Sequence, residues 1–448
     1  MSEAIEQMLD RARHLAATGE SEQARGLYLD ILRRDPVHFA ALNELAILAY
    51  EGGHRSAART LYELAVRSQP QNPFARVNLG NLLYEAGEAD AAHTHFEAEL
   101  ALDGAWAEAH QGLARILADK GESEAADAHW RKSFRGQATT TRRYRGAPPG
   151  IPLLLLVSAR GGNIPMLPFL DERVFAVTAL YAEYYDPALP LPPHALLFNS
   201  IGDADLCGDA LAKAQAIAAR SNAPIVNPPE RVQATGRADN ARRLGTLKDV
   251  IAPQIRNFAR RAPPDDLVFP LLLRAPGFHT GQHFMRVEQA KDLPSAIAAL
   301  PGEELLAIEW RDTRGADGLF RKYRVMLIGS ELYPLHLAIS TDWKVHYFTT
   351  DMQHQPAWRE EEQRFLDDMP GVLGPRVLAA LERIAQDLGL DYAGVDFALA
   401  PDGALLLFEA NATMVLAPPD PDPLWDYRRP AIARARDAAQ RILLEKAR

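Results

Sequence analysis

Cysteine is nearly absent, since the chain of 448 residues contains only Cys207. A single cysteine cannot form an internal disulfide, and this fits a reducing compartment. No pattern around Cys207 supports a nucleophile, so we interpret it as a small apolar residue of the core.

Long apolar runs are also missing. No stretch reaches the roughly 20 apolar residues that a membrane helix needs. The N-terminal MSEAIEQMLDRARHLAATGE is acidic and lacks the apolar core of a secretion signal. We therefore expect a soluble, cytoplasmic protein that does not bind membranes.

A basic charge excess is absent as well. The formal charge is −10 and the pI is about 5.8, which argues against a nucleic-acid partner. Hydrophobic residues make up 47% of the chain and charged residues 24%, as in globular proteins. The length predicts two or three domains.

Four features recur in the first third of the chain at an interval of 34 residues. They are the glycines Gly19, Gly53, Gly87 and Gly121; the alanines Ala24, Ala58, Ala92 and Ala126; the aromatics Tyr28, Tyr62, Phe96 and Trp130; and the prolines Pro36 and Pro70, replaced by Gly104 in the third repeat. The spacing predicts one helix pair per repeat. Glycine then lies in the turn, alanine allows close helix approach and the aromatic fills the gap.

This pattern resembles the tetratricopeptide repeat (TPR) over about Ile5 to Arg135. The resemblance implies an α-solenoid over residues 1–135, and its concave face would bind a peptide or protein. The alternative is a packing role or a homodimer contact. Residues 136–150 (GQATTTRRYRGAPPG) have linker composition.

Strands and helices alternate after the linker, beginning with the buried-strand pattern IPLLLLVSA at 151–159. We expect a small α/β subdomain over 151–235 and a larger region over 236–448. Candidate nucleotide contacts follow in the second region. They are Arg274 at the end of a strand, Gly277, His279, Thr280 and Gly281 in the next loop, Glu309 at another strand end, and Lys322 with Arg324 on one strand face.

The segment GVDFALAPDGALLLFEAN (394–411) contains an Asp-Gly pair between two strand patterns. A two-residue turn at Asp402 and Gly403 would place Asp396 opposite Glu409. It would also place Asn411 opposite Gly394, whose missing side chain leaves space for a ligand.

Two facing carboxylates with an amide oxygen beside them would repel unless a cation lay between them. Mg²⁺ suits these oxygen ligands and completes its shell with nucleotide phosphates. Calcium, or a polar strand end without a metal, are the alternatives.

Together, GVDF, FEAN, PLLLRAPGFHTGQ and AIEW resemble the ATP-grasp superfamily, similar to glutathione synthetase and D-alanine:D-alanine ligase, over 151–448. The resemblance implies a three-subdomain ATP-grasp fold, and thus an α plus α/β multidomain chain. It also implies ATP as cosubstrate and Mg²⁺ held by Asp396, Glu409 and Asn411. This chain has Arg274 and Asn240 where the family usually has lysines.

The implied reaction is ATP-dependent joining of a carboxylate and an amine through an acyl phosphate. Arg324, Lys344 and His346 are the candidate catalytic residues, and His336 is interpreted as a satisfied interior histidine. The substrates would be a small-molecule or peptide carboxylate and an amine, with the repeats recruiting a peptide or protein. The alternatives are a small-molecule ligase with partner-binding repeats, a phosphotransferase and a nucleotide-binding scaffold.

Overall fold

The chain forms two compact units. The computed structural model describes residues 2–134, 138–142, 144–166, 169–276, 282–347, 350–419 and 422–448. Unit 1 comprises Met1–Thr139 and Tyr184–Asp186, and unit 2 comprises Thr140–Glu183 and Pro187–Arg448. In these described ranges no helix is both long and apolar enough to cross a bilayer.

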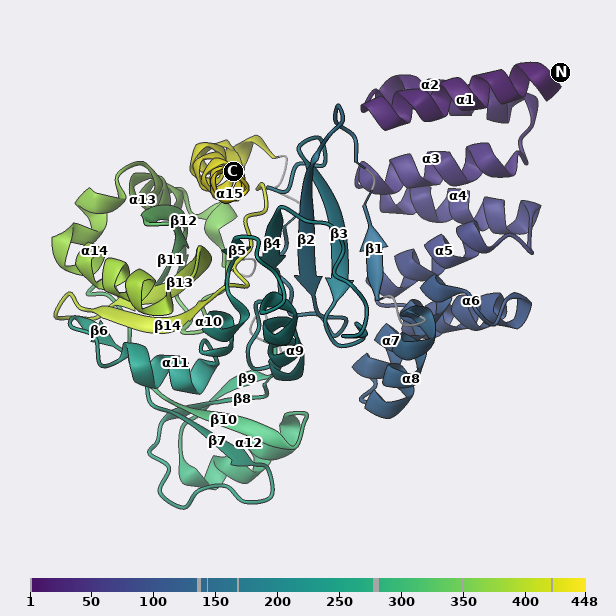
Figure 1. Cartoon of the computed structure of the whole chain (residues 1–448). Helices are drawn as coiled ribbons and strands as arrows, with labels where there is room; N and C mark the ends of the chain where they lie inside the picture. The colour runs from purple at the N-terminus through teal and green to yellow at the C-terminus, as the bar shows by residue number, and fades with distance from the viewer. Residues whose placement is uncertain are drawn as a thin grey trace. The chain divides into compact units, whose positions relative to one another are not determined.

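Unit 1 is a stack of helix pairs (Figure 1). The helices are α1 (Ser2–Thr18), α2 (Ser21–Arg34), α3 (Phe39–Glu51), α4 (Arg55–Ser68), α5 (Pro73–Glu85), α6 (Ala89–Leu102), α7 (Ala107–Asp119) and α8 (Ser123–Phe134). The glycines at 34-residue spacing lie in the turn within each pair, with φ between 79° and 87°. Glycine adopts this backbone without steric cost. The predicted array of helix pairs is therefore confirmed.

The repeated small and aromatic residues form the core of this stack. Ala24, Ala58 and Ala92 are fully buried. Phe96 is also fully buried, and its ring lies so close to Gly80 and Gly112 that a Cβ at either glycine would clash with it. The third repeat therefore packs its aromatic ring against the two neighbouring helices through their glycines.

Gly112→Ala should lower the free energy of unfolding of unit 1 by about 1–2 kcal/mol, because the new methyl group would overlap Phe96. Gly26→Ala is the matched control, since nothing lies within 4 Å of its Cβ position in the exposed part of α2. Alanine should stabilise that helix by roughly 0.5–1 kcal/mol. Urea unfolding followed by circular dichroism measures both. Equal effects of the two substitutions would contradict this packing.

The described residues of unit 2 form three sheets (Figure 1). The first has the order β1-β3-β2-β4-β5, from β1 (Thr139–Thr141), β3 (Phe175–Tyr181), β2 (Ile151–Val157), β4 (Leu196–Asn199) and β5 (Ile225–Val226). Its β2, β3, β4 and β5 pair in parallel. Part of the predicted linker thus forms an edge strand. The helices α9 (Gly208–Ala218), α10 (Pro229–Gln233) and α11 (Arg237–Leu244) follow along the chain.

The second sheet is antiparallel, in the order β7-β10-β8-β9. Its strands are β7 (Ile255–Ala259), β10 (Glu304–Glu309), β8 (Leu271–Arg274) and β9 (Phe284–Val287), and α12 (Leu293–Ala299) packs against it. Leu271, Leu273, Leu305 and Val287 are buried in its core. The sheet therefore holds Arg274 and Glu309 at the ends of two adjacent antiparallel strands, and the two residues lie at opposite ends of this strand pair.

The third sheet has the order β12-β11-β13-β14-β6. Its strands are β12 (Glu331–Ser340), β11 (Phe320–Ile328), β13 (Tyr392–Leu399), β14 (Leu405–Asn411) and β6 (Val250–Ile251). The helices α13 (Pro356–Asp367), α14 (Met369–Leu388) and α15 (Arg429–Lys446) each contact β12. This sheet contains the predicted metal-binding hairpin.

Candidate functional site

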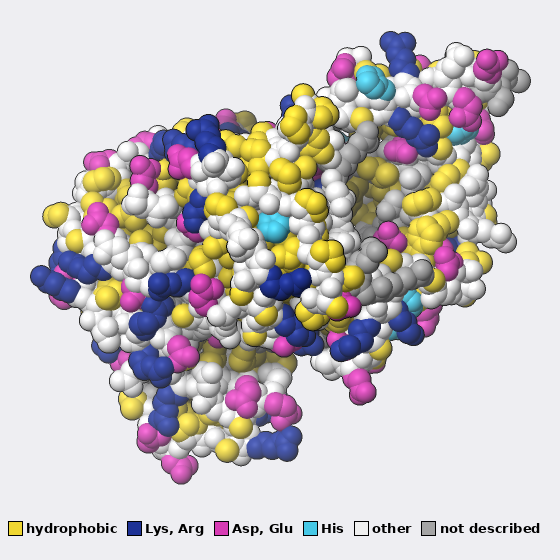
Figure 2. All heavy atoms as spheres, viewed as in Figure 1, with side chains coloured by type: hydrophobic (Ala, Val, Ile, Leu, Met, Phe, Trp, Pro, Cys, Tyr) yellow, Lys and Arg dark blue, Asp and Glu magenta, His cyan; other side chains and the backbone are white. Residues whose placement is uncertain are grey.

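A cavity of about 700 Å³ in unit 2 is lined by side chains of the second and third sheets. Seven of the described lining residues are basic and two are acidic. The basic residues are Arg237, Arg274, Arg311, Lys322, Arg324, Lys344 and Arg428, and the acidic ones are Glu309 and Glu409. The outer face drawn in Figure 2 instead intersperses basic and acidic side chains. The cavity is thus cationic within an acidic chain, as expected for an anionic ligand.

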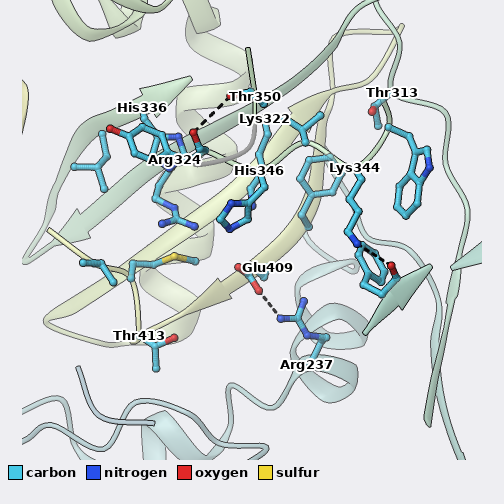
Figure 3. Close-up of a pocket in the computed structure, with 18 of the residues that line it drawn as sticks. Arg237, Thr313, Lys322, Arg324, His336, Lys344, His346, Thr350, Glu409 and Thr413 are labelled. Carbon is cyan, nitrogen blue, oxygen red and sulfur yellow. Dashed lines mark hydrogen bonds and ion pairs between the residues drawn. The ribbon is translucent and has the colours of Figure 1, made fainter. Parts of the chain in front are cut away.

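The structure brings together most of the predicted nucleotide and catalytic residues. Arg274, Glu309, Lys322, Arg324, Lys344, His346 and Glu409 all line the cavity, and Figure 3 labels five of them. Their segments lie as much as 135 positions apart in the chain, from Arg274 to Glu409. The predictions on Gly277, His279, Thr280 and Gly281 lie outside the described residues.

The hairpin of β13 and β14 places Asp396 opposite Glu409, as predicted. The predicted two-residue turn is wrong. Ala400 and Ala404 form the closing pair, so the loop has three residues, Pro401 to Gly403, with Gly403 at φ 81°. A bulge between Asp396 and Phe397 then shifts the register by one residue and restores the expected pair.

Three neighbouring pairs form a continuous row across the third sheet. His336 pairs with Arg324, Arg324 pairs with Asp396, and Asp396 pairs with Glu409. Directly paired residues project from the same sheet face. The row therefore presents one imidazole, one guanidinium and two carboxylates on adjacent strands.

Asp396 is completely buried and forms ion pairs with two cations. Its Oδ1 accepts from Arg324 Nε at 2.5 Å, and its Oδ2 accepts from Arg324 Nη2 at 2.7 Å and from Lys322 Nζ at 2.5 Å. Burial alone would raise the pKa of Asp396, but the charges of Arg324 and Lys322 hold that pKa far below its usual value. Asp396 is therefore a carboxylate at every physiological pH.

Glu409 faces the cavity and forms an ion pair with Arg237 at the start of α11 (Figure 3). Burial would raise the pKa of Glu409, and the nearby Arg237 outweighs this effect, so the pKa lies below its usual value. Glu409 is thus also ionised at neutral pH.

Asn411 pairs with Gly394 as predicted, but the space expected at Gly394 is not there. Asn411 lines a separate hollow of about 40 Å³, and its Oδ1 accepts from Thr413 N at 3.0 Å and Thr413 Oγ1 at 2.9 Å. The prediction that Gly394 leaves space for a ligand is wrong, because Met414 and Met326 fill that space.

A hard cation fits this donor set in chemistry and charge, because two ionised carboxylates face each other beside an amide oxygen. Of the three predicted metal ligands, only Glu409 lines the large cavity. A bound cation would have to displace Lys322 or Arg324 from Asp396. Phosphate groups offer those cations an alternative anionic partner, so a metal would fit together with a polyphosphate.

Arg237 is a cavity residue that the sequence patterns did not single out. In the segment GRADNARRL, Asn240 is buried and donates to the Ala410 carbonyl at 2.5 Å. Arg242 is exposed beside Asp239, and Arg243 pairs with Asp387. Arg237 alone of these three arginines lines the cavity. Its position directly after Gly236, at the first residue of α11, is the signal that could have indicated it.

Aromatic side chains form one wall of the cavity. Phe284 and Trp343 lie 5.4 Å apart between ring centroids, and Trp310 and Trp343 lie 5.7 Å apart. Lys344 Nζ donates to the Phe284 carbonyl at 3.0 Å, so it is fixed beside this wall. A planar, apolar group of a ligand would have a matching surface here.

His336 also differs from its prediction as a satisfied interior histidine. It is 5% exposed and lines the cavity, and neither ring nitrogen has a hydrogen-bond partner among the described residues. Burial, followed by the charges of Arg324, Lys322 and Arg428, lowers the pKa of His336 well below its usual value. The imidazole is therefore neutral at physiological pH.

Comparison with known proteins finds similarity between the N-terminal part of this chain and solved helical-repeat structures. No protein-family model and no curated sequence matches the chain. The solved structure MamA MSR-1 C2 has 21% identity, covering 29% of this chain and 75% of its own, with a TM-score of 0.26. MamA 41-end from Desulfovibrio magneticus RS-1 has 20% identity, covering 29% and 74%, with a TM-score of 0.27. A tetratricopeptide repeat protein from Parabacteroides merdae has 18% identity, covering 30% and 53%, with a TM-score of 0.28. These alignments lie in the N-terminal repeats and leave the cavity outside.

Proposed function

We propose that unit 2 is an ATP- and Mg²⁺-dependent carboxylate–amine ligase and that the repeats of unit 1 recruit its peptide or protein substrate. The supporting observation is the cavity itself, in which seven basic side chains and two carboxylates surround about 700 Å³. A nucleotide with its phosphates needs both the volume and this charge.

In this proposal the triphosphate lies against Arg237, Arg274, Lys322 and Arg324. The adenine lies by the aromatic wall of Phe284, Trp310 and Trp343, and the Glu309 carboxylate accepts from a ribose hydroxyl. Glu309 Oε2 already accepts from the backbone N–H of Gln254 at 3.1 Å, and this contact holds the side chain at the cavity edge.

Magnesium would be held by Glu409, Asp396 and Asn411. Bound there with phosphate, it would supply positive charge to the phosphate oxygens. The residues of the chain would act beside it: Lys322 and Arg324 would turn from Asp396 towards the phosphates, and Arg237 would release Glu409.

The reaction would proceed in two steps. A carboxylate oxygen of the first substrate attacks the γ-phosphorus, the bond to the ADP oxygen breaks, and an acyl phosphate forms. The amine nitrogen then attacks the acyl carbon, phosphate leaves with the bonding electrons, and the amine proton passes to phosphate or solvent. The protein would contribute cations that stabilise the charge on the transferring group, and no protein nucleophile takes part.

ADP release tests this function. A ligase releases ADP from MgATP only when a carboxylate and an amine are both supplied, and the product contains an amide. A phosphotransferase would leave phosphate on a stable product, and a scaffold would bind ATP without turnover. Peptides and amino acids are the substrates to test first, because the repeats of unit 1 are proposed to recruit a peptide or protein.

Arg274→Met should weaken ATP binding about 10-fold to 100-fold, because a charge-assisted contact to phosphate is lost. Arg274→Lys should keep most of the affinity, since lysine supplies the charge at this position in the resembled family. Isothermal calorimetry with a non-hydrolysable ATP analogue measures both variants. Unchanged ATP affinity in Arg274→Met would show that the phosphates of the nucleotide do not bind at Arg274.

A further inference from the structure

His336 is a buried polar side chain that faces the cavity without a hydrogen-bond partner among the described residues. Such groups are rare in folded proteins, because a buried donor or acceptor normally finds a partner. The histidine is held in place from both sides: it pairs with Arg324 across the sheet, and its ring lies 4.6 Å from the Tyr347 ring. A ligand can therefore supply the missing hydrogen bond without moving the side chain.

The position of His336 separates it from Asp396 and Glu409, two of the residues proposed to hold magnesium. It lies two strands from Asp396 and three from Glu409. At about 4.8 Å per strand these offsets are roughly 10 Å and 14 Å. Arg324 and His346 lie between His336 and Glu409 in Figure 3. A group bound at His336 would thus lie beside Arg324, next to the phosphates, and away from the proposed magnesium ligands.

The cavity lining includes the apolar and aromatic residues Leu335, Tyr347, Met414, Val415, Trp425 and Ile432, and the Tyr347 ring lies against His336. Arg428 is one of the charged residues that act on His336, and the buried Glu362 compensates its charge at 2.7 Å. Trp425 and Tyr347 also cover Arg428, with its guanidinium 4.0 Å and 4.7 Å from their ring centroids. This part of the cavity therefore suits an apolar group.

Metal binding does not explain His336. The cations Arg324, Lys322 and Arg428 act electrostatically on His336 and would repel a metal ion. In the described ranges no group of three histidine, cysteine, aspartate or glutamate residues could hold one. An organic ligand with a hydrogen-bond acceptor fits these surroundings better, and Arg324 beside the histidine favours an anionic acceptor.

We infer that His336 binds the carboxylate substrate. Its ring N–H donates to a carboxylate oxygen next to Arg324, and the apolar wall takes an aromatic or branched aliphatic group of the same molecule. This inference rests on the proposed function and adds the substrate class: a carboxylic acid with a bulky apolar group near the carboxyl carbon, such as the C-terminal residue of a peptide.

The test uses full-length protein, MgATP and hydroxylamine, which traps an acyl phosphate as a hydroxamate. The acids are N-acetylglycine, N-acetyl-L-leucine and N-acetyl-L-phenylalanine. For the wild type we expect a KM at least 10-fold lower for the leucine or phenylalanine derivative than for the glycine one. His336→Phe should raise the KM for the preferred acid at least 10-fold and leave the KM for ATP within twofold. His336→Gln, which keeps a donor and an acceptor, should recover part of the loss.

A spectroscopic measurement separates binding from folding. In protein labelled with ¹⁵N-histidine, the His336 signal, identified by its loss in His336→Gln, should move when the preferred acid is added. The inference is overturned if ATP binds to the wild type but no acid yields hydroxamate, if the glycine derivative is used equally well, or if His336→Phe and His336→Gln both leave the KM for the acid unchanged. Failure of ATP to bind to the wild type would instead overturn the proposed function.

Discussion

Glu409→Gln should reduce ADP release about 100-fold to 1000-fold, because it removes a preorganised charge from the reacting end of the cavity. The substitution keeps the shape of the side chain and takes away only its charge. Without that charge the site loses an anionic ligand for a cation, and Arg237 loses its ion-pair partner. Because the pKa of Glu409 lies below its usual value, the wild-type rate should show no loss attributable to this residue between about pH 5 and 9.

Glu361→Gln is the matched control for Glu409→Gln. Glu361 forms an ion pair with Arg321 at 2.6 Å, and its side chain is 25% exposed, against 23% for Glu409. It does not line the cavity. Glu361→Gln should therefore change the free energy of unfolding by a small amount, similar to that of Glu409→Gln, and leave the rate of ADP release unchanged. Equal rates of the Glu409 variant and the wild type, with substrates that support turnover, would show that Glu409 has no part in the reaction.

Local sequence periodicity was sufficient to predict unit 1. A glycine at one position of every repeat, an alanine five residues later and an aromatic four residues after that are constraints within a single helix pair. The same packing recurs in each helix pair of the stack, so the pattern in one repeat supported the helix-pair prediction for the other repeats. In the third repeat the ring of Phe96 packs against glycines of two neighbouring helices, and a spacing rule limited to one repeat does not show this contact.

The sequence predicted those parts of the candidate site that depend on the pairing of adjacent strands. It did not predict the cavity residues contributed by helices and loops. The pairing of Asp396 with Glu409 follows from the hairpin, although two local deviations had to cancel to produce it. Arg237 reaches the cavity from a helix start, Tyr347 from a loop and Trp425 from the 3₁₀ helix Pro423–Arg428. Their placement depends on how the sheets and loops pack in three dimensions, which no local period encodes.

Asp396→Asn should lower the free energy of unfolding of unit 2 by about 3–5 kcal/mol, the range for breaking a buried ion pair on one side. Arg324 and Lys322, whose side chains are 18% and 15% exposed, would face each other with their shared anion gone. Hydrogen exchange of β13 peptides at increasing urea measures this loss separately from unit 1. The lowered pKa of Asp396 gives stability that is present above its unfolded value of about 3.9 and is lost as the pH falls towards the folded value. The difference between variant and wild type should therefore shrink below about pH 4.

The double variant Asp396→Asn/Lys322→Met decides whether charge imbalance causes this loss. Removing Lys322 alone leaves Asp396 paired with Arg324 through two contacts, so Lys322→Met should cost much less than Asp396→Asn. Removing both leaves one cation in place of two, and the double variant should be more stable than Asp396→Asn by at least about 1 kcal/mol. If the double variant is instead the less stable of the two, Asp396 stabilises the sheet through packing and hydrogen bonding. Repulsion between Lys322 and Arg324 would then contribute little to the loss of stability in Asp396→Asn. Lys322 and Arg324 could then separate from Asp396 at a small cost in free energy. The proposed movement of these two cations from Asp396 to the nucleotide phosphates would therefore meet only a small energetic barrier.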